Sequence, residues 1–334
     1  MELRYLAFSH RGETLAGQLA AALGGAAARC GRPLSLAAWT AENFAQGRGL
    51  IFIGAAGIAV RAIAPWIRSK TTDPAVVVVD EGGRFAVPIL SGHLGGANDL
   101  ARAIADVCGG TAVVTTATDT RGLFAVDEWA RRQNGQVVEP ERIRNVSAAV
   151  LSGETVRVFS PWPIGGERPP GVAVAEDGND CEVCLDIRAS GGGCLHIAPR
   201  ILTLGVGCRR GTGREALERA FAALVERSGV WPEAVAGAAS IDLKREEQGL
   251  LDFCAAHGWL CRFYSAARLE AAEGAFTPSA FVKDVTGVDN VCERSAVLAS
   301  GGTLYWKKSA GEGVTMALAA APYAPTWRWK ADGE

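Results

Sequence analysis

The sequence predicts an α/β protein with two α/β domains joined by a small β-rich segment. Three observations lead to this prediction. Apolar runs of strand length alternate with helix-length periodic segments over the first 135 residues, which is typical of a mainly parallel or mixed sheet. The same alternation resumes near residue 201. Between these parts the chain has short β-like runs separated by proline and glycine.

The length of 334 residues fits this division, since domains average roughly 150 residues. We expect a Rossmann-like N-terminal domain at residues 1–135, a connecting domain at 136–200, a C-terminal domain at 201–322 and a tail at 323–334. The hydrophobic share of 49% and the charged share of 21% indicate a well-packed core.

In the N-terminal domain we expect strands at 3–8, 50–53, 75–79, 85–90 and 112–116, and helices at 13–23, 58–67, 97–107 and 123–133. Gly82-Gly83 favours a hairpin between the third and fourth of these strands. Ligands of open α/β sheets bind at the carboxyl ends of strands. Both Gly54–Gly57 and Ser91–Gly96 are predicted to lie at such ends.

The middle segment is predicted to hold a helix at 139–151 and two or three hairpins, built from strands at 155–159, 172–175, 183–187 and 194–197. The C-terminal domain is predicted to have helices at 214–227, 247–257 and 291–299. Its strands are expected at 201–207, 234–241, 260–264, 303–308 and 314–318.

Charge and hydropathy exclude several classes of function. The net charge is −2, so no surface for nucleic acid is expected. The N-terminal run Met1–Leu6 lacks a long apolar segment and no stretch reaches 18 uncharged apolar residues, so we expect neither a signal peptide nor a membrane span. The nine cysteines are then expected to be reduced thiols of a cytoplasmic protein.

The block from Ser91 to Asp99 has the features of a site for an anion or a developing negative charge. A strand leads into a glycine-rich turn and then a helix, and the turn carries His93, one of four histidines. His93 is predicted to act as an acid or base, with the Gly95 and Gly96 amides as oxyanion donors. The alternative is a structural turn, because the near-neighbour spacing of Ser91 and His93 defines no triad and Ser91 is not in a G-x-S-x-G elbow. Asp80, at a strand end, is a second candidate base.

Two further patterns are weaker. Gly205-Val206-Gly207 suggests a dinucleotide fingerprint, but Arg210 stands where the third glycine should be, so an anion-binding turn assisted by Arg209 and Arg210 fits better. Cys181, Cys184, Cys194 and His196 permit a metal site without requiring one, and free thiols in strands are the alternative.

Several blocks together resemble the CbiG family of cobalamin biosynthesis. They are Gly54–Arg61, 70–80, 90–98, Leu204–Thr212, Ala239–Lys244, Thr286–Val288, Val291–Glu293 and Gly313–Thr315. Their order and separation resemble the family from about residue 50 to 320. The C-terminal half is also similar to a domain that stands alone in the aerobic pathway.

The resemblance implies a cobalt-precorrin-5A hydrolase of the anaerobic pathway. Its substrate is a cobalt-bearing tetrapyrrole whose ring A δ-lactone is opened by water, with loss of a two-carbon unit as acetaldehyde. Cobalt then arrives with the substrate, so no protein cofactor or metal is expected. The alternative is a non-catalytic carrier of tetrapyrrole intermediates. A homodimer and contacts with other cobalamin-pathway enzymes are left open.

We place the expected active site in a cleft between the two α/β domains. The expected catalytic residues are His93, Ser91 and Asp80. Lactone opening needs an activated water and donors to the oxyanion, and the substrate's acetate and propionate groups need cations and backbone donors. The residues expected to bind substrate are Gly54, Gly57, Arg61, Lys70, Gly95, Gly96, Asn98, Cys208, Arg209, Gly211, Thr212, Lys244, Thr286 and Gly287.

Overall fold

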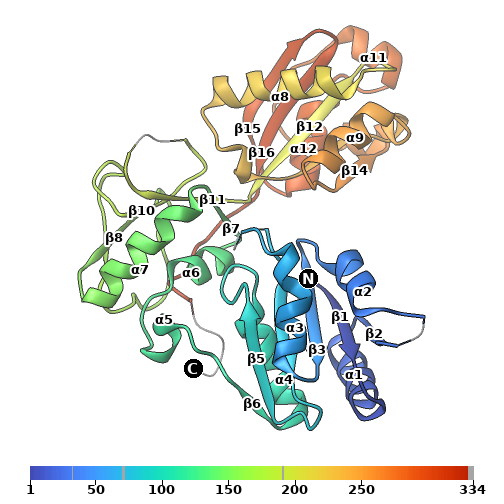
Figure 1. Cartoon of the computed structure of the whole chain (residues 1–334). Coiled ribbons are helices and arrows are strands. Elements are labelled where there is room, and N and C mark those ends of the chain that lie inside the picture. Colours follow the sequence, from blue (N-terminus) through green and yellow to red (C-terminus); the bar gives the residue numbers. More distant parts are fainter. Residues whose placement is uncertain (32, 70–71, 190–191, 330–334) are drawn as a thin grey trace.

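The computed structural model describes residues 1–31, 33–69, 72–189 and 192–329. The chain forms three sheets, and each has its own helices and apolar core (Figure 1). The mixed α/β fold class predicted from the sequence is confirmed. None of the helices in the described part of the chain has both the length and the apolar character needed to cross a membrane.

The N-terminal sheet has six strands in the order β2-β1-β3-β4-β5-β6. All neighbours are parallel except β4 and β5, which form the predicted hairpin. One apolar cluster packs α1 and α4 on one face, and another packs α2 and α3 on the opposite face. The elements are β1 (Glu2–Ala7), α1 (His10–Leu23), β2 (Ala26–Arg29), α2 (Leu36–Asn43), β3 (Arg48–Ile53), α3 (Ala56–Ile63), η1 (Ala64–Trp66), β4 (Ala75–Val79), β5 (Phe85–Leu90), α4 (Ala97–Cys108) and β6 (Thr111–Ala112).

The predicted strand at 112–116 is much shorter than expected, because β6 ends at Ala112. The chain then turns into two short helices, α5 (Ala117–Thr120) and α6 (Val126–Arg132), in place of the single predicted helix at 123–133. The side chain of Trp129 in α6 is completely buried in the core of the middle sheet. These helices therefore join the first sheet to the second.

The middle sheet has the order β7-β11-β10-β8-β9, and the predicted hairpins are wrong. Only β7 and β11 are antiparallel, and the other neighbours are parallel. The Pro- and Gly-rich stretches, such as the one between β8 and β9, are long enough to return the chain to the same end of the sheet, as parallel pairing requires. The elements are β7 (Gly135–Val137), η2 (Pro140–Arg142), α7 (Ile143–Ser152), β8 (Val156–Phe159), β9 (Val172–Val174), β10 (Val183–Leu185) and β11 (Leu195–Pro199).

The C-terminal sheet has the order β14-β13-β12-β16-β15, with the first three strands parallel and the last two antiparallel to their neighbours. Helices α8 and α9 contribute to its main core. The elements are β12 (Leu202–Cys208), α8 (Arg214–Ser228), η3 (Pro232–Ala234), β13 (Val235–Ile241), η4 (Asp242–Lys244), α9 (Gln248–Ala256), β14 (Cys261–Tyr264), α10 (Ala266–Glu270), α11 (Ala280–Thr286), α12 (Cys292–Ser300), β15 (Thr303–Gly311) and β16 (Val314–Ala320).

After β16 the chain returns to the middle sheet (Figure 1). The ring of Trp327 stacks on that of Trp129 with centroids 5.6 Å apart, and Trp327 is buried in the middle core. The Trp129 indole N–H donates to the carbonyl oxygen of Thr326 at 2.7 Å. Residues 323–329 of the predicted tail thus pack on the middle sheet.

Candidate active site

The turn between β5 and α4 folds back on itself. The amides of Ala97 and Asn98, which begin α4, donate to the carbonyl oxygens of Ser91 and Gly92 at 3.1 and 3.0 Å. Gly96 has a φ of 81°, in the left-handed region that glycine adopts without strain. The Gly96 amide donates to the His93 carbonyl oxygen at 2.9 Å. The turn is therefore closed by its own hydrogen bonds, and the Gly96 N–H is not free to serve as an oxyanion donor in this structure.

His93 lies between two aspartates from the helices that follow. Its Nε2 is 2.6 Å from Asp119 Oδ2 on α5, and its Nδ1 is 3.0 Å from Asp127 Oδ1 on α6. The side chains of His93 and Asp127 are each 12% exposed. Burial alone would lower the pKa of His93, but hydrogen bonds to Asp119 and Asp127 outweigh it and raise the pKa from 6.5 to about 10. At neutral pH the ring is an imidazolium that donates to both carboxylates.

Asp119 is the more firmly held of the two carboxylates. Its Oδ2 accepts hydrogen bonds from the Thr116 hydroxyl and from Asn98 Nδ2, the latter at 3.3 Å, and its Oδ1 accepts from Arg102 at 3.1 Å. Burial raises the pKa of Asp119, but the bonds from His93 and Thr116 outweigh it and keep the pKa well below its ordinary value. Asp119 is thus a preorganised anion that fixes the orientation of the His93 ring.

A group of ion pairs extends from this site along α4 and α6. Asp99 pairs with Arg102, Arg131 and Arg132, and Glu128 pairs with Arg131 at 2.6 Å and with Arg132 at 2.7 Å. Both carboxylates lie within the first turn of their helices, where the helix dipole favours negative charge. These pairs connect the first sheet to α6 and hence to the middle sheet.

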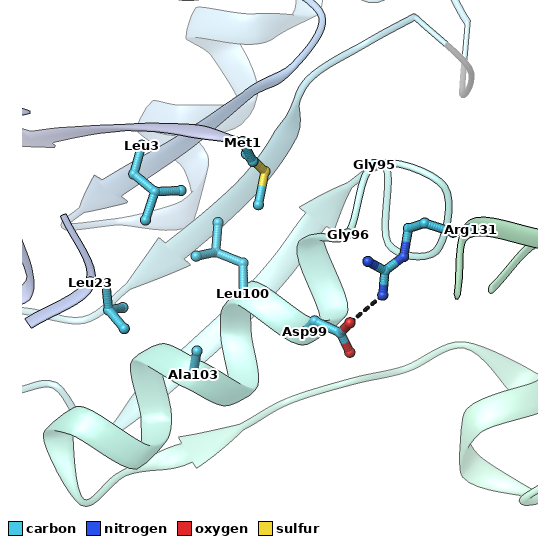
Figure 2. Close-up of a pocket in the computed structure, with 9 residues that line it drawn as sticks. All are labelled: Met1, Leu3, Leu23, Gly95, Gly96, Asp99, Leu100, Ala103 and Arg131. Atoms are coloured by element: carbon cyan, nitrogen blue, oxygen red, sulfur yellow. Dashed lines mark hydrogen bonds and ion pairs between the residues drawn. The ribbon is translucent and has the colours of Figure 1, made fainter. Parts of the chain in front are cut away.

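An open cavity of about 470 Å³ lies beside this group (Figure 2). One side of it is polar, with the turn glycines Gly95 and Gly96 and the pair Asp99 and Arg131. The other side is apolar and consists of Met1, Leu3, Leu23, Leu100 and Ala103. The combination of an apolar wall with a few polar groups is usual for small-molecule sites.

The structure separates some of the predicted N-terminal site residues from His93. Because β5 runs antiparallel to β4, Ser91–Gly96 lies at the edge of the sheet where β1, β3 and β4 begin. Both Ser91–Gly96 and Gly54–Gly57 follow the carboxyl ends of strands, as predicted, but the two segments lie at opposite edges of the sheet. Gly54, Gly57 and Arg61 follow β3 at the opposite edge, where the Arg61 guanidinium donates to the Gly57 carbonyl oxygen.

The candidate catalytic residues Asp80 and Ser91 have structural partners. The Asp80 carboxylate accepts from the amides of Gly82 and Phe85 in the hairpin turn, at the edge remote from His93. The Ser91 hydroxyl donates to the Asp73 carbonyl oxygen at 3.1 Å. Asn98, predicted to bind substrate, is buried and holds Asp119. Lys70 lies outside the described residues.

The predicted residues of the C-terminal domain gather after β12, at the end of that strand remote from the middle sheet (Figure 1). Here the carboxylate of Glu247 contacts groups that were predicted to bind a carboxylate of the substrate. Its Oε1 accepts from the Gly211 amide at 2.7 Å, and its Oε2 pairs with Lys244 at 3.0 Å. The Thr212 hydroxyl donates to the Arg209 carbonyl oxygen. Burial raises the pKa of Cys208, which precedes this loop.

Thr286 and Gly287 form the end of α11. The Thr286 hydroxyl donates to the Val282 carbonyl oxygen, and Gly287 caps the helix with a left-handed φ of 78°. The glycines of the dinucleotide-like pattern also have a packing role, because a Cβ at Gly205 would overlap the Cys292 carbonyl oxygen of α12. Close packing between β12 and α12 thus accounts for Gly205 without a bound ligand.

Within the cysteine–histidine group of the middle sheet, Cys184, Cys194 and His196 are buried and Cys181 is partly exposed. Cys194 Sγ lies 3.3 Å from His196 Nε2, and His196 Nδ1 is 2.8 Å from Glu139 Oε1. In the described parts of the chain, no set of three or more His, Cys, Asp and Glu side chains is arranged to hold a metal ion.

Reasoning from the sequence missed Asp119, Asp127, Arg102 and Arg131. The sequence did contain a signal for Asp119, because the segment 117–120 follows the predicted strand at 112–116, at the end of the strand where ligands bind. Asp127 and Arg131 stand in a helix whose periodicity indicated only packing. Their approach to His93 and to the cavity depends on how α6 packs against α4.

Comparison with known proteins covers most of the chain. A family model described as "Cobalamin synthesis G N-terminal" matches residues 38–119, and one described as "Cobalamin synthesis G C-terminus" matches residues 202–319. The chain is 31% identical over 303 residues to the cobalt-precorrin-5A hydrolase of Priestia megaterium, covering 84% of this chain and 80% of that protein. It is 32% identical over 296 residues to the cobalt-precorrin-5A hydrolase of Salmonella typhimurium (strain LT2), covering 84% of each. A solved structure of CobE, a protein from the cobalamin (vitamin B12) biosynthetic pathway, is 30% identical with a TM-score of 0.35, covering 37% of this chain and 93% of that one.

Proposed function

The chain belongs to the cobalamin synthesis G family, and from this premise we propose that it hydrolyses cobalt-precorrin-5A. The observation that carries the proposal is the similarity, at 31% and 32% identity over 84% of the chain, to two relatives named for that activity. The two matched regions lie in the N-terminal and the C-terminal sheet domains. The His93 turn and Asp119 lie within the N-terminal region.

The reaction sets clear chemical demands. Water adds to the lactone carbonyl and the ring C–O bond breaks, which leaves a carboxylate and an alkoxide on the two-carbon unit. The carbon–carbon bond between the two-carbon unit and the macrocycle then breaks, and the alkoxide becomes the carbonyl of acetaldehyde. The macrocycle carbon keeps the electron pair of that bond and takes up a proton. A base is needed to activate the water, and its pKa is best placed near the working pH. Cobalt enters with the substrate in this proposal.

We propose that His93 is this base and that Asp119 orients it. A ring nitrogen must first be released, because both are donors in the present arrangement. In this proposal the contact between His93 Nδ1 and the Asp127 carboxylate is the one that breaks. Asp119 is fixed by Thr116, Asn98 and Arg102, whereas the paired Oδ1 of Asp127 is otherwise bonded only to the Glu128 amide among the described residues. Loss of the Asp127 carboxylate from the ring lowers the pKa of His93 toward the range that suits a base.

The test is incubation of the purified protein with cobalt-precorrin-5A, with acetaldehyde trapped and measured. We expect release of one acetaldehyde per substrate and a fall in kcat of about 10²- to 10⁴-fold in His93→Gln, the usual contribution of a general base. A non-catalytic carrier, the alternative function, would bind the substrate and release no aldehyde. That result would overturn the hydrolase proposal.

A homodimer, contacts with other cobalamin-pathway enzymes and a cytoplasmic location stay predictions. Sedimentation of the purified protein across a range of concentrations tests the first. Co-purification with the enzymes that supply and consume the substrate tests the second, and cell fractionation tests the third.

A further inference from the structure

The cavity beside the His93 turn contains a cation whose hydrogen-bonding capacity is only partly used. The Arg131 guanidinium lies beside the Gly96 turn and contacts Asp99 at the polar side of this cavity (Figure 2). Its side chain is 32% exposed. The opposite side is apolar, so a ligand that fits both sides needs an apolar body and an anionic group.

The individual nitrogen atoms of Arg131 show which part is available. Nε donates to Glu128 Oε2 at 3.0 Å, and Nη2 contacts Asp99 and donates to Glu128 Oε1 at 2.6 Å. Nη1 makes no hydrogen bond to any residue in the described part of the chain, and it lies 3.9 Å from the position that a Cβ of Gly96 would occupy. The two N–H groups of Nη1 therefore remain available beside the glycine turn.

The two acidic partners fix the guanidinium. Burial would lower the pKa of Arg131, but Glu128 and Asp99 outweigh it and raise the pKa, so the side chain stays charged. The bonds at Nε and Nη2 also restrict its rotation. A ligand anion would thus meet a charged donor that is already oriented, which reduces the cost of binding.

We infer that this cavity binds a carboxylate group of the substrate, with Arg131 Nη1 as its anchor and Leu3, Leu23 and Leu100 against the adjoining apolar part. The inference rests on the proposed function, because the acetate and propionate groups of the tetrapyrrole supply this combination of anion and apolar body. A carboxylate held here places the bound ring next to the turn that carries His93.

Arg132 supplies a matched control. It forms ion pairs with the same two carboxylates, Asp99 and Glu128, but it does not line the cavity. Arg131→Gln and Arg132→Gln therefore each remove one cation from the same group of ion pairs. Only the first removes a donor from the cavity.

The test measures KM and kcat for cobalt-precorrin-5A, together with the dissociation constant of the substrate by equilibrium dialysis. We expect Arg131→Gln to raise KM and the dissociation constant about tenfold or more, as loss of a charge-assisted hydrogen bond does, with kcat within about twofold. Arg131→Lys keeps the charge without the fixed fork and should give an intermediate increase. Arg132→Gln should leave both constants within about twofold of the wild type.

The inference is overturned if Arg131→Gln binds substrate as the wild type does, or if Arg132→Gln weakens binding equally. The proposed function fails separately, if the wild type binds substrate and releases no acetaldehyde. In that case the dissociation constants still test the carboxylate subsite. A wild-type protein that does not bind the substrate refutes both.

Discussion

Replacing Asp127 by asparagine is expected to lower the pKa of His93. The elevation from 6.5 to about 10 corresponds to a preference for the imidazolium of about 5 kcal/mol, at about 1.4 kcal/mol per pH unit. The carboxylates of Asp119 and Asp127 favour the imidazolium, whereas burial disfavours it. The asparagine keeps the shape of Asp127 but removes its charge, so about half of the preference should be lost, which lowers the pKa by about 1 to 2.

The assay is an NMR titration of the His93 ring between pH 5 and pH 11. The chain has four histidines, so His93→Gln identifies the signal of interest by its absence. If His93 acts as the base, the rise of kcat with pH in Asp127→Asn should move to lower pH together with the NMR value. An unchanged pKa in Asp127→Asn would refute the idea that this carboxylate holds the ring proton. A lowered pKa without any movement of the rate profile would remove His93 from the base role.

Three other perturbations have definite outcomes. Asp119→Asn should lower kcat by on the order of 10²-fold, because the ring loses its orienting anion, and a rate equal to the wild type would contradict this. Because the folded-state pKa of His93 lies above its ordinary value, the contribution of the imidazolium to stability is complete below pH 6.5 and is lost as the pH rises to about 10. In urea unfolding, the wild type should therefore lose up to about 5 kcal/mol of stability relative to His93→Gln over that interval. Parallel pH profiles of the two proteins would show that the ring is not held as an imidazolium. In thermal unfolding, Gly205→Ala should destabilise the C-terminal sheet by about 1 to 3 kcal/mol or more, because the Cβ of the new alanine would overlap the Cys292 carbonyl oxygen. The control is Gly17→Ala, where the new Cβ would have open space, and this variant should be neutral or slightly stabilising.

The sequence allowed the polar turn to be located but not its surroundings. Local signals sufficed for β5, the glycine turn and α4, because the apolar run and the helix start are adjacent in the chain. They also predicted the hairpin between β4 and β5. That hairpin reverses the direction of β5, so the turn lies at the edge opposite Gly54, a consequence that the rule for parallel sheets did not include.

The partners of His93 were beyond the reach of local patterns. Asp119 and Asp127 follow His93 by 26 and 34 positions, on two separate helices, and no motif links them. The acidic partner of the predicted cation site after β12 was missed for a related reason. Arg209 and Lys244 suggested an uncompensated positive charge, but Glu247 from the next turn satisfies Lys244 and the Gly211 amide.

The stacking of Trp327 on Trp129 has a consequence for biosynthesis. On the ribosome, α6 is made about 200 residues before Trp327, and the middle core lacks this tryptophan until that residue has emerged. Asp127 is part of the same helix as Trp129. A nascent or prematurely terminated chain that ends before Trp327 would therefore carry Asp127 on a helix whose packing in the middle core is incomplete, and the position of this carboxylate beside the His93 ring would be less well fixed.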